Sequence, residues 1–173
     1  MDNSSLIYSV NIPSITLHDA LLHTMNDWFD AVVAESRIKD YANVKDIRDA
    51  SIALMDKEFN QLLLEKINTV AEEYAKINNI KIFKLEGFHI VKYERGQFFK
   101  DHVDKTQEFP RKISAVFYLN DDYTGGSITF TKINKSFKPK AGTLMVFPSS
   151  EDFSHAAEAV VDGVKYVIVG FWQ

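Results

Sequence analysis

The segment FFKDHVDK, residues 98–105, places a histidine and a carboxylate two positions apart, at His102 and Asp104. In a strand or its immediate exit, side chains at i and i+2 point the same way. The pair can therefore offer one imidazole nitrogen and one carboxylate oxygen to a single ion. A face of two histidines and one carboxylate suits non-haem Fe(II), because it leaves coordination positions open for a co-substrate and oxygen. The spacing alone does not decide the matter, since a polar exit from a strand produces the same pattern.

A second histidine for such a site has to come from elsewhere in the chain. His18 and His23 fall in a predicted amphipathic helix, where a surface position is the simpler interpretation. His89 opens a predicted strand and is expected to be an ordinary core or edge residue. His155 differs, because it follows the apolar run TLMVFP and a polar turn and then opens another strand. His155 is therefore the candidate third ligand.

Lys165 follows ten residues after His155, in the run VKYVIVGFW. Strand alternation places it on the face that carries Val167, Val169 and Phe171. A lysine on an apolar strand face calls for an anionic partner, because an unpaired buried ammonium is costly. The alternative is that Lys165 begins the strand and extends its ammonium to water. An anionic co-substrate would supply the partner.

The predicted secondary structure changes from helices to strands near residue 80. Apolar residues recur every three or four positions from Ser14 to about Ser36 and from about Asp49 to Ile77, which predicts two amphipathic helices. After them, short β-rich runs are punctuated by Gly, Asn and Asp. They predict seven strands, namely KIFKLEG, FHIVKYER, KISAVFYLN, SITFTK, TLMVFP, HAAEAVV and KYVIVGFW. Helices followed by many strands predict an α+β fold, with the helices covering one face of an antiparallel sandwich or barrel.

The composition narrows the class of protein. The chain has 173 residues, which favours one domain with a real core, and 46% of them are hydrophobic. Its net charge of −4 does not suggest a binder of phosphate backbones. The absence of cysteine excludes disulfides, iron–sulfur clusters and thiolate zinc sites. The N-terminus does not resemble a signal peptide and no apolar run is long enough to span a bilayer, so we expect a cytoplasmic protein with no membrane partner.

The segment FTKINKSFKPK, residues 130–140, concentrates Lys132, Lys135, Lys138 and Lys140. A solvated loop is the simpler interpretation. A mobile basic flap that covers the site and selects an acidic or extended peptide is the alternative.

The ordered set of motifs over about residues 85–172 resembles the Fe(II)- and 2-oxoglutarate-dependent dioxygenases, specifically their prolyl 4-hydroxylase-like branch. The resemblance rests on Tyr93-x-x-Gly96-Gln97-x-Phe99-x-x-His102-x-Asp104, on Arg111 followed by Tyr118-Leu119-Asn120 and Gly125-Gly126, and on Gly142-Thr143-Leu144, Phe147, His155, Gly163 and Lys165. It implies a double-stranded β-helix (jelly-roll) core with N-terminal helices packed on one sheet. The whole chain, residues 1–173, would be a single domain, with about 1–80 as helical support and about 81–173 as the jelly-roll core.

The resemblance also implies roles for individual residues. The iron ligands would be His102, Asp104 and His155, with no catalytic side chain beyond them. The residues at the co-substrate would be Lys165, in a salt bridge to the C5 carboxylate of 2-oxoglutarate, and Tyr93, Tyr118 and Thr129. The substrate side would carry Arg111, Phe99 and Phe171.

The implied reaction is hydroxylation of a C–H bond by O2 and 2-oxoglutarate, with release of succinate and CO2 and with ascorbate as an accompanying reductant. Asp104 favours hydroxylation over halogenation, because related halogenating enzymes replace this carboxylate with a small residue. A peptidyl proline in a peptide or protein is the first expected substrate. The alternatives are a free amino acid or small metabolite, and a catalytically silent jelly-roll binding module. Oxidative demethylation of nucleic acid is disfavoured by the acidic pI and by lysine rather than arginine at position 165.

Overall fold

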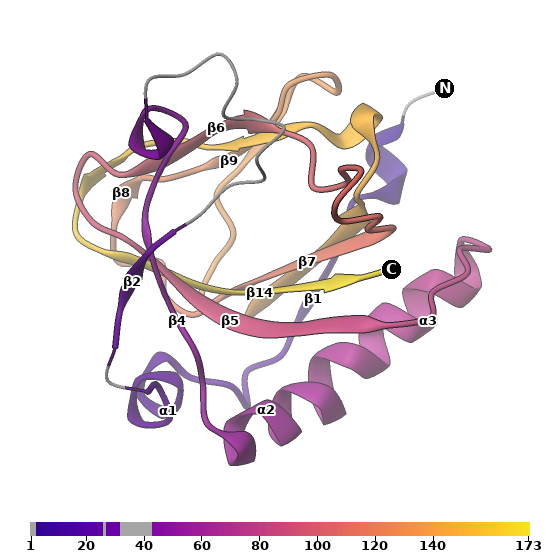
Figure 1. Ribbon diagram of the computed structural model, residues 1–173, viewed down its shortest axis with the longest axis horizontal. Coiled ribbons are helices and arrows are strands. Elements are labelled where there is room, and N and C mark those ends of the chain that lie inside the picture. Colours follow the sequence, from indigo (N-terminus) through magenta and orange to yellow (C-terminus); the bar gives the residue numbers. More distant parts are fainter. Residues whose placement is uncertain (1–2, 26, 32–42) are drawn as a thin grey trace.

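The computed structural model describes residues 3–25, 27–31 and 43–173 (Figure 1). Two antiparallel sheets make up most of this part of the chain. The larger sheet has seven strands in the order β1 (Tyr8–Asn11), β11 (Thr143–Pro148), β7 (Ile113–Tyr118), β14 (Lys165–Trp172), β5 (Leu85–Tyr93), β4 (Ser51–Ala53) and β2 (Phe29–Asp30). The smaller sheet has five, in the order β10 (Lys135–Phe137), β9 (Ile128–Phe130), β12 (His155–Ala157), β6 (Phe98–His102) and β3 (Arg48–Asp49). A short pair, β13 (Val160–Asp162) and β8 (Thr124–Gly125), lies beside them. The arrangement is the expected double-stranded β-helix.

The helices cover the outer face of the seven-stranded sheet (Figure 1). They are α1 (Leu17–Leu22), α2 (Lys57–Leu63) and α3 (Thr69–Ile77), and a π-helical segment, Leu64–Asn68, joins the last two into one rod. Asp56 starts this rod, because its side chain accepts the backbone N–H of Phe59 at 2.9 Å. Phe59, Leu63, Ile67 and Ala71 face Ile90 and Ile168 of the sheet in one buried cluster. The prediction of helices packed on one sheet is confirmed.

The site lies on the other face of the same sheet. Strand alternation divides β5 between two cores, since Ile90 packs under the helices whereas Val91 and Tyr93 face the smaller sheet. β14 divides in the same way, with Ile168 toward the helices and Val167 toward the smaller sheet. The inner layer between the sheets therefore collects the side chains that the sequence placed around Lys165.

Both predicted helices are shorter than expected. The first ends at Leu22 and is followed by β2, while residues 26 and 32–36 of its predicted range lie outside the described residues. The second begins at Lys57 instead of Asp49. Residues 51–53 form β4 instead, because they pair with β5, whose free edge would otherwise leave backbone groups unpaired. Tertiary pairing here overrides a helical periodicity.

Some predicted strand boundaries also change. The end of KIFKLEG joins FHIVKYER in the single strand β5, whereas residues 81–84 form no strand, and HAAEAVV divides into β12 and β13. The segment FFKDH is itself a strand, β6. The lysine-rich segment folds back as a β9–β10 hairpin, so the prediction of a loop there is wrong for residues 135–137. Within the described part of the chain, no helix is long and apolar enough to cross a membrane.

Candidate active site

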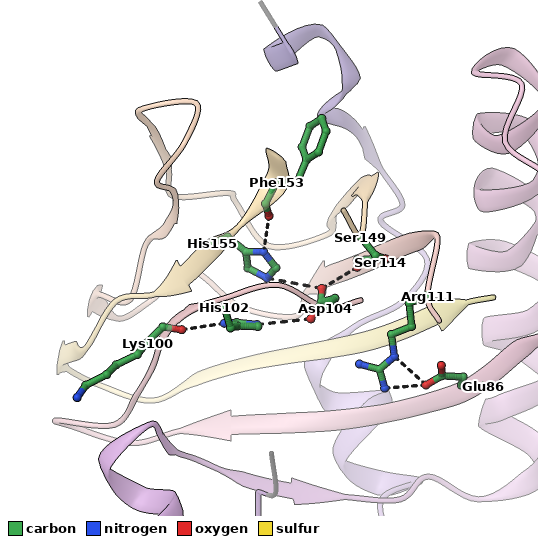
Figure 2. A network of polar contacts seen from close by, with 9 residues as sticks. All are labelled: Glu86, Lys100, His102, Asp104, Arg111, Ser114, Ser149, Phe153 and His155. Carbon is green, nitrogen blue, oxygen red and sulfur yellow. Dashed lines mark hydrogen bonds and ion pairs between the residues drawn. The ribbon is translucent and has the colours of Figure 1, made fainter. Parts of the chain in front are cut away.

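The three predicted metal ligands come together between two neighbouring strands (Figure 2). His102 ends β6 and His155 begins β12, and the two residues are direct partners in the antiparallel ladder. Asp104 follows in the turn after β6. One ligand atom from each residue lies within 4.8 Å of the others, and all three side chains are buried. Pairing of distant strands therefore completes the site that the His102–Asp104 spacing began.

Backbone carbonyls orient both histidines. His102 Nδ1 lies 2.8 Å from the carbonyl oxygen of Lys100, and His155 Nδ1 lies 3.0 Å from that of Phe153. A carbonyl only accepts, so each Nδ1 carries a proton, and Nε2 is the ring nitrogen that can present a lone pair. The Nε2 atoms point to the Asp104 carboxylate, at 3.5 Å for His102 and 3.7 Å for His155. Three sets of lone pairs thus face one another, which fits a cation held between them.

The protonation states also fit a metal. Burial, followed by the proximity of His155, lowers the pKa of His102 to about 4, so this imidazole is neutral at neutral pH. Burial alone would raise the pKa of Asp104, but the two histidines and a hydrogen bond from Ser114 hold it well below its usual range. A neutral imidazole and an ionised carboxylate are the forms that bind a divalent cation.

The three predicted metal ligands line a cavity between the sheets, and Lys165 lines the same cavity at what we call its inner end. Lys165 stands at the start of β14, opposite Tyr93 of β5. It is 3% exposed, and its Nζ donates to the carbonyl oxygen of Gly126 at 2.7 Å. Burial, and then the charge of Lys138, lowers its pKa to about 7. The Tyr118 ring centroid lies 5.3 Å from Nζ, and the Tyr118 hydroxyl is buried without a hydrogen-bond partner. A cation and an unsatisfied donor therefore lie together where a carboxylate would satisfy both.

The cavity has a volume of about 240 Å³ and extends past the metal ligands to a second, more aromatic end. Phe99 stacks on His102 with ring centroids 3.5 Å apart. Arg111 lies with its guanidinium carbon 3.7 Å from the ring centroid of Phe171, and it binds Glu86 through Nε and a terminal nitrogen at 2.9 and 2.6 Å. All three residues predicted for the substrate side therefore line the cavity.

Thr129 is the one predicted co-substrate residue that the structure places elsewhere. It is flanked in β9 by Ile128 and Phe130, which are buried toward the interior. Alternation turns Thr129 to the opposite face, where its hydroxyl donates to Ser136 at 3.1 Å. The expectation of Thr129 at the co-substrate is corrected accordingly.

Sequence reasoning missed several residues that line the cavity, among them the basic side chains of His89 and Arg48. His89 was expected to be an ordinary strand residue, but it lies beside Phe171, with ring centroids 6.3 Å apart. Burial, and then the charges of Arg48 and Arg111, lowers its pKa to about 3, so it is neutral. The guanidinium carbon of Arg48 lies 4.6 Å from the ring centroid of Phe99. Alternation with Val91 and Tyr93 is a signal for His89, whereas no local pattern points to Arg48.

A jelly roll with two histidines and one carboxylate between its sheets is an arrangement typical of non-haem iron oxygenases. Residues 88–173, about half of the chain, match the 2OG-Fe(II) oxygenase superfamily. The chain belongs to this family.

Individual relatives agree with this assignment. A PKHD-type hydroxylase of Rippkaea orientalis is 39% identical over 89 residues, which are 46% of this chain and 39% of that protein. A putative prolyl 4-hydroxylase of Acanthamoeba polyphaga mimivirus is 25% identical over 157 residues, 75% of this chain and 65% of that one. The chain thus spans less than two thirds of either relative. Among solved structures, a prolyl hydroxylase of Trichoplax adhaerens, in complex with a hypoxia inducible factor peptide fragment, superposes with a TM-score of 0.75 at 18% identity, over 98% of this chain and 84% of that one. This structural likeness supports the fold.

Proposed function

We propose that residues 1–173 form one Fe(II)- and 2-oxoglutarate-dependent dioxygenase domain that hydroxylates a C–H bond, with a peptidyl proline first among its substrates. The convergence of two imidazole nitrogens, each oriented by a backbone carbonyl, on one carboxylate carries the proposal. Bound iron and 2-oxoglutarate would supply the oxidation of the C–H bond by O2, with release of succinate and CO2. The protein itself would bind and orient the co-substrate and the substrate and would exclude water from the site.

The residues of the inner end would hold the co-substrate. Lys165 would bind its C5 carboxylate, since no carboxylate among the described residues forms an ion pair with this ammonium. The Tyr118 hydroxyl, which is buried without a hydrogen-bond partner, would donate a hydrogen bond to the same carboxylate. Tyr93, whose ring centroid lies 5.4 Å from Lys165 Nζ, would form the wall beside it. A dicarboxylate matches this set, because its other end remains available to the metal.

The second, more aromatic end of the cavity would receive the substrate. Phe99 and Phe171 offer apolar surface, and Arg111 lies against Phe171. Figure 2 shows the remaining terminal nitrogen of Arg111 turned away from Glu86, so it can donate to a peptide carbonyl. A peptide substrate is further supported by the relatives that are named prolyl hydroxylases and by the peptide bound to the Trichoplax adhaerens protein.

The experiment supplies anaerobic protein with Fe(II), 2-oxoglutarate and then oxygen, and measures succinate. We expect slow succinate formation without a prime substrate and none in a His102→Ala variant. A panel of proline-containing peptides, read by a mass gain of one oxygen atom, then identifies the substrate. Wild-type protein that forms no succinate with any peptide, amino acid or metabolite would overturn the proposal in favour of a silent binding module. Turnover of free proline without turnover of peptides would replace the peptidyl assignment.

A further inference from the structure

Two buried serines extend the metal site on the side away from the histidines (Figure 2). Ser114, on β7, lies with its Oγ 2.6 Å from Asp104 Oδ2. Ser149, just after β11, lies with its Oγ 2.7 Å from that of Ser114. Their exposed fractions are 0% and 2%. Three side chains that are far apart in the sequence thus form one continuous chain of hydrogen bonds.

The direction of this chain follows from the contact between Ser114 and Asp104. The Ser114 hydroxyl is the donor at 2.6 Å and the carboxylate oxygen is the acceptor. This bond uses the single proton of the Ser114 hydroxyl. Having no second proton, Ser114 accepts from Ser149. A hydroxyl that donates to a carboxylate at this distance makes a strong, short hydrogen bond, so the carboxylate is held in one orientation.

Ser149 also holds the backbone around Asp104. Its carbonyl oxygen accepts the N–H of Lys105, the residue after Asp104, at 3.0 Å. Its own N–H donates to the carbonyl oxygen of Lys112, just before β7, at 2.9 Å. The residue at the end of β11 therefore positions the Asp104 turn through the main chain and, through Ser114, the Asp104 carboxylate as well.

The two carboxylate oxygens consequently differ. Each oxygen faces one histidine, Oδ1 the Nε2 of His102 at 3.5 Å and Oδ2 the Nε2 of His155 at 3.7 Å, but only Oδ2 also accepts the hydrogen bond from Ser114. The bond from Ser114 occupies one lone pair of Oδ2 and withdraws electron density from it, so Oδ1 is the stronger donor to a metal. A ligand that binds through one oxygen leaves a further position for the co-substrate and oxygen.

We propose that Ser114 and Ser149 are positioning residues that hold Asp104 as a one-oxygen ligand, through Oδ1, of the divalent metal. The inference rests on the proposed function, since it requires a metal at the triad. Hydrogen-bonded partners of metal ligands typically contribute about 10- to 100-fold in metal affinity. Ser114 touches the ligand itself and should contribute within that range. Ser149 acts through Ser114 and should contribute less.

The test is titration of the metal-free protein with Co(II) alone, read by the visible absorption of the bound ion, which reports its coordination number. We expect Ser114→Ala to raise the Kd for Co(II) by about 10- to 100-fold and to change the spectrum. Ser149→Ala should raise it by less than about 10-fold. Ser114→Thr keeps the hydroxyl and should restore both the affinity and the spectrum, which loss of packing alone does not predict.

The control is Tyr74→Phe, which removes another buried hydroxyl hydrogen bond, from Tyr74 to the carbonyl of Leu6 at 2.8 Å, far from the metal. It should lower stability without changing Co(II) binding. Equal Kd and spectrum in wild type and Ser114→Ala would overturn the inference while leaving the proposed function intact. Wild-type protein that binds no Co(II) would overturn the proposed function and the inference with it. If Ser114→Ala does not fold, Ser149→Ala decides, and unchanged binding and spectrum in that variant overturn the inference.

Discussion

Replacement of Lys165 by methionine tests the co-substrate site most directly, because it keeps the apolar stem and removes only the ammonium. Removing one partner of a buried charge pair costs about 3 to 5 kcal/mol. Part of this is offset, because the free protein already lowers the pKa of Lys165 to about 7. At pH 8, restoring the proton for the ion pair costs about 1.4 kcal/mol. The net loss is about 2 to 4 kcal/mol, so the Kd for 2-oxoglutarate should rise about 30- to 1,000-fold.

The same pKa predicts that binding of 2-oxoglutarate is coupled to uptake of a proton. When a carboxylate arrives, the ammonium gains a partner and its pKa rises, so binding above pH 7 takes up a proton. The affinity of wild-type protein should therefore fall with rising pH above about 7, whereas the Lys165→Met variant lacks this component. In the absence of ligand, rising pH has the opposite effect on the stability of the folded protein from its effect on the affinity. The unfolded chain binds more protons between pH 7 and 10.5, so this group makes the folded protein more stable as pH rises through that window.

The assay is calorimetric titration of 2-oxoglutarate into protein loaded with Mn(II) under anaerobic conditions, in buffers of different ionisation enthalpy. Lys140→Met is the matched control, since this lysine side chain is 85% exposed and pairs with Asp121 at the surface. It should leave the affinity and the proton uptake unchanged. Equal Kd and equal proton uptake in wild type and Lys165→Met would refute the assignment of this lysine to the co-substrate.

Three further substitutions test how the fold supports the site. Phe99→Ala removes a ring stacked on His102, a proposed metal ligand. It should lower the free energy of unfolding by about 3 to 5 kcal/mol in urea, and a loss below about 1 kcal/mol would contradict its packing role. Gly126→Ala places a Cβ 2.9 Å from Tyr123 Cε2 at a φ of +64°, so it should shift the carbonyl that holds the buried lysine and weaken 2-oxoglutarate binding, with Co(II) binding unchanged as the internal control. Trp172→Phe loses the indole hydrogen bond to Asn68 at 2.8 Å and should cost about 1 to 3 kcal/mol of stability, whereas an unchanged denaturation midpoint would show that this bond contributes nothing.

Much of the site could be predicted because its residues belong to local patterns. The i, i+2 spacing of His102 and Asp104 needs only an extended backbone to put both side chains on one side. Alternation along the last strand likewise predicted that Lys165 faces an apolar interior, where the structure buries it. Hydrophobic periodicity also gave the rod of α2 and α3, whose apolar stripe covers the sheet.

Other features depended on which elements become neighbours. Residues 49–53 fall in the predicted second helix, yet Asp49 ends β3 and residues 51–53 form β4, because the edges of β6 and β5 offer unpaired backbone groups. Thr129 was misplaced for a related reason, since family spacing does not state which face of a strand turns inward. No local pattern in the sequence linked either feature to its partner strand.

By itself, the sequence determined the ligand types, their order along the chain and the faces on which they lie, because these follow from backbone periods of a few residues. Only the tertiary structure decided that His102 pairs with His155 and that Ser114 and Ser149 extend the site behind Asp104. Those contacts join residues ten or more positions apart. Their physical cause is the simultaneous burial of apolar faces and pairing of strand edges, and no single segment of the chain encodes it.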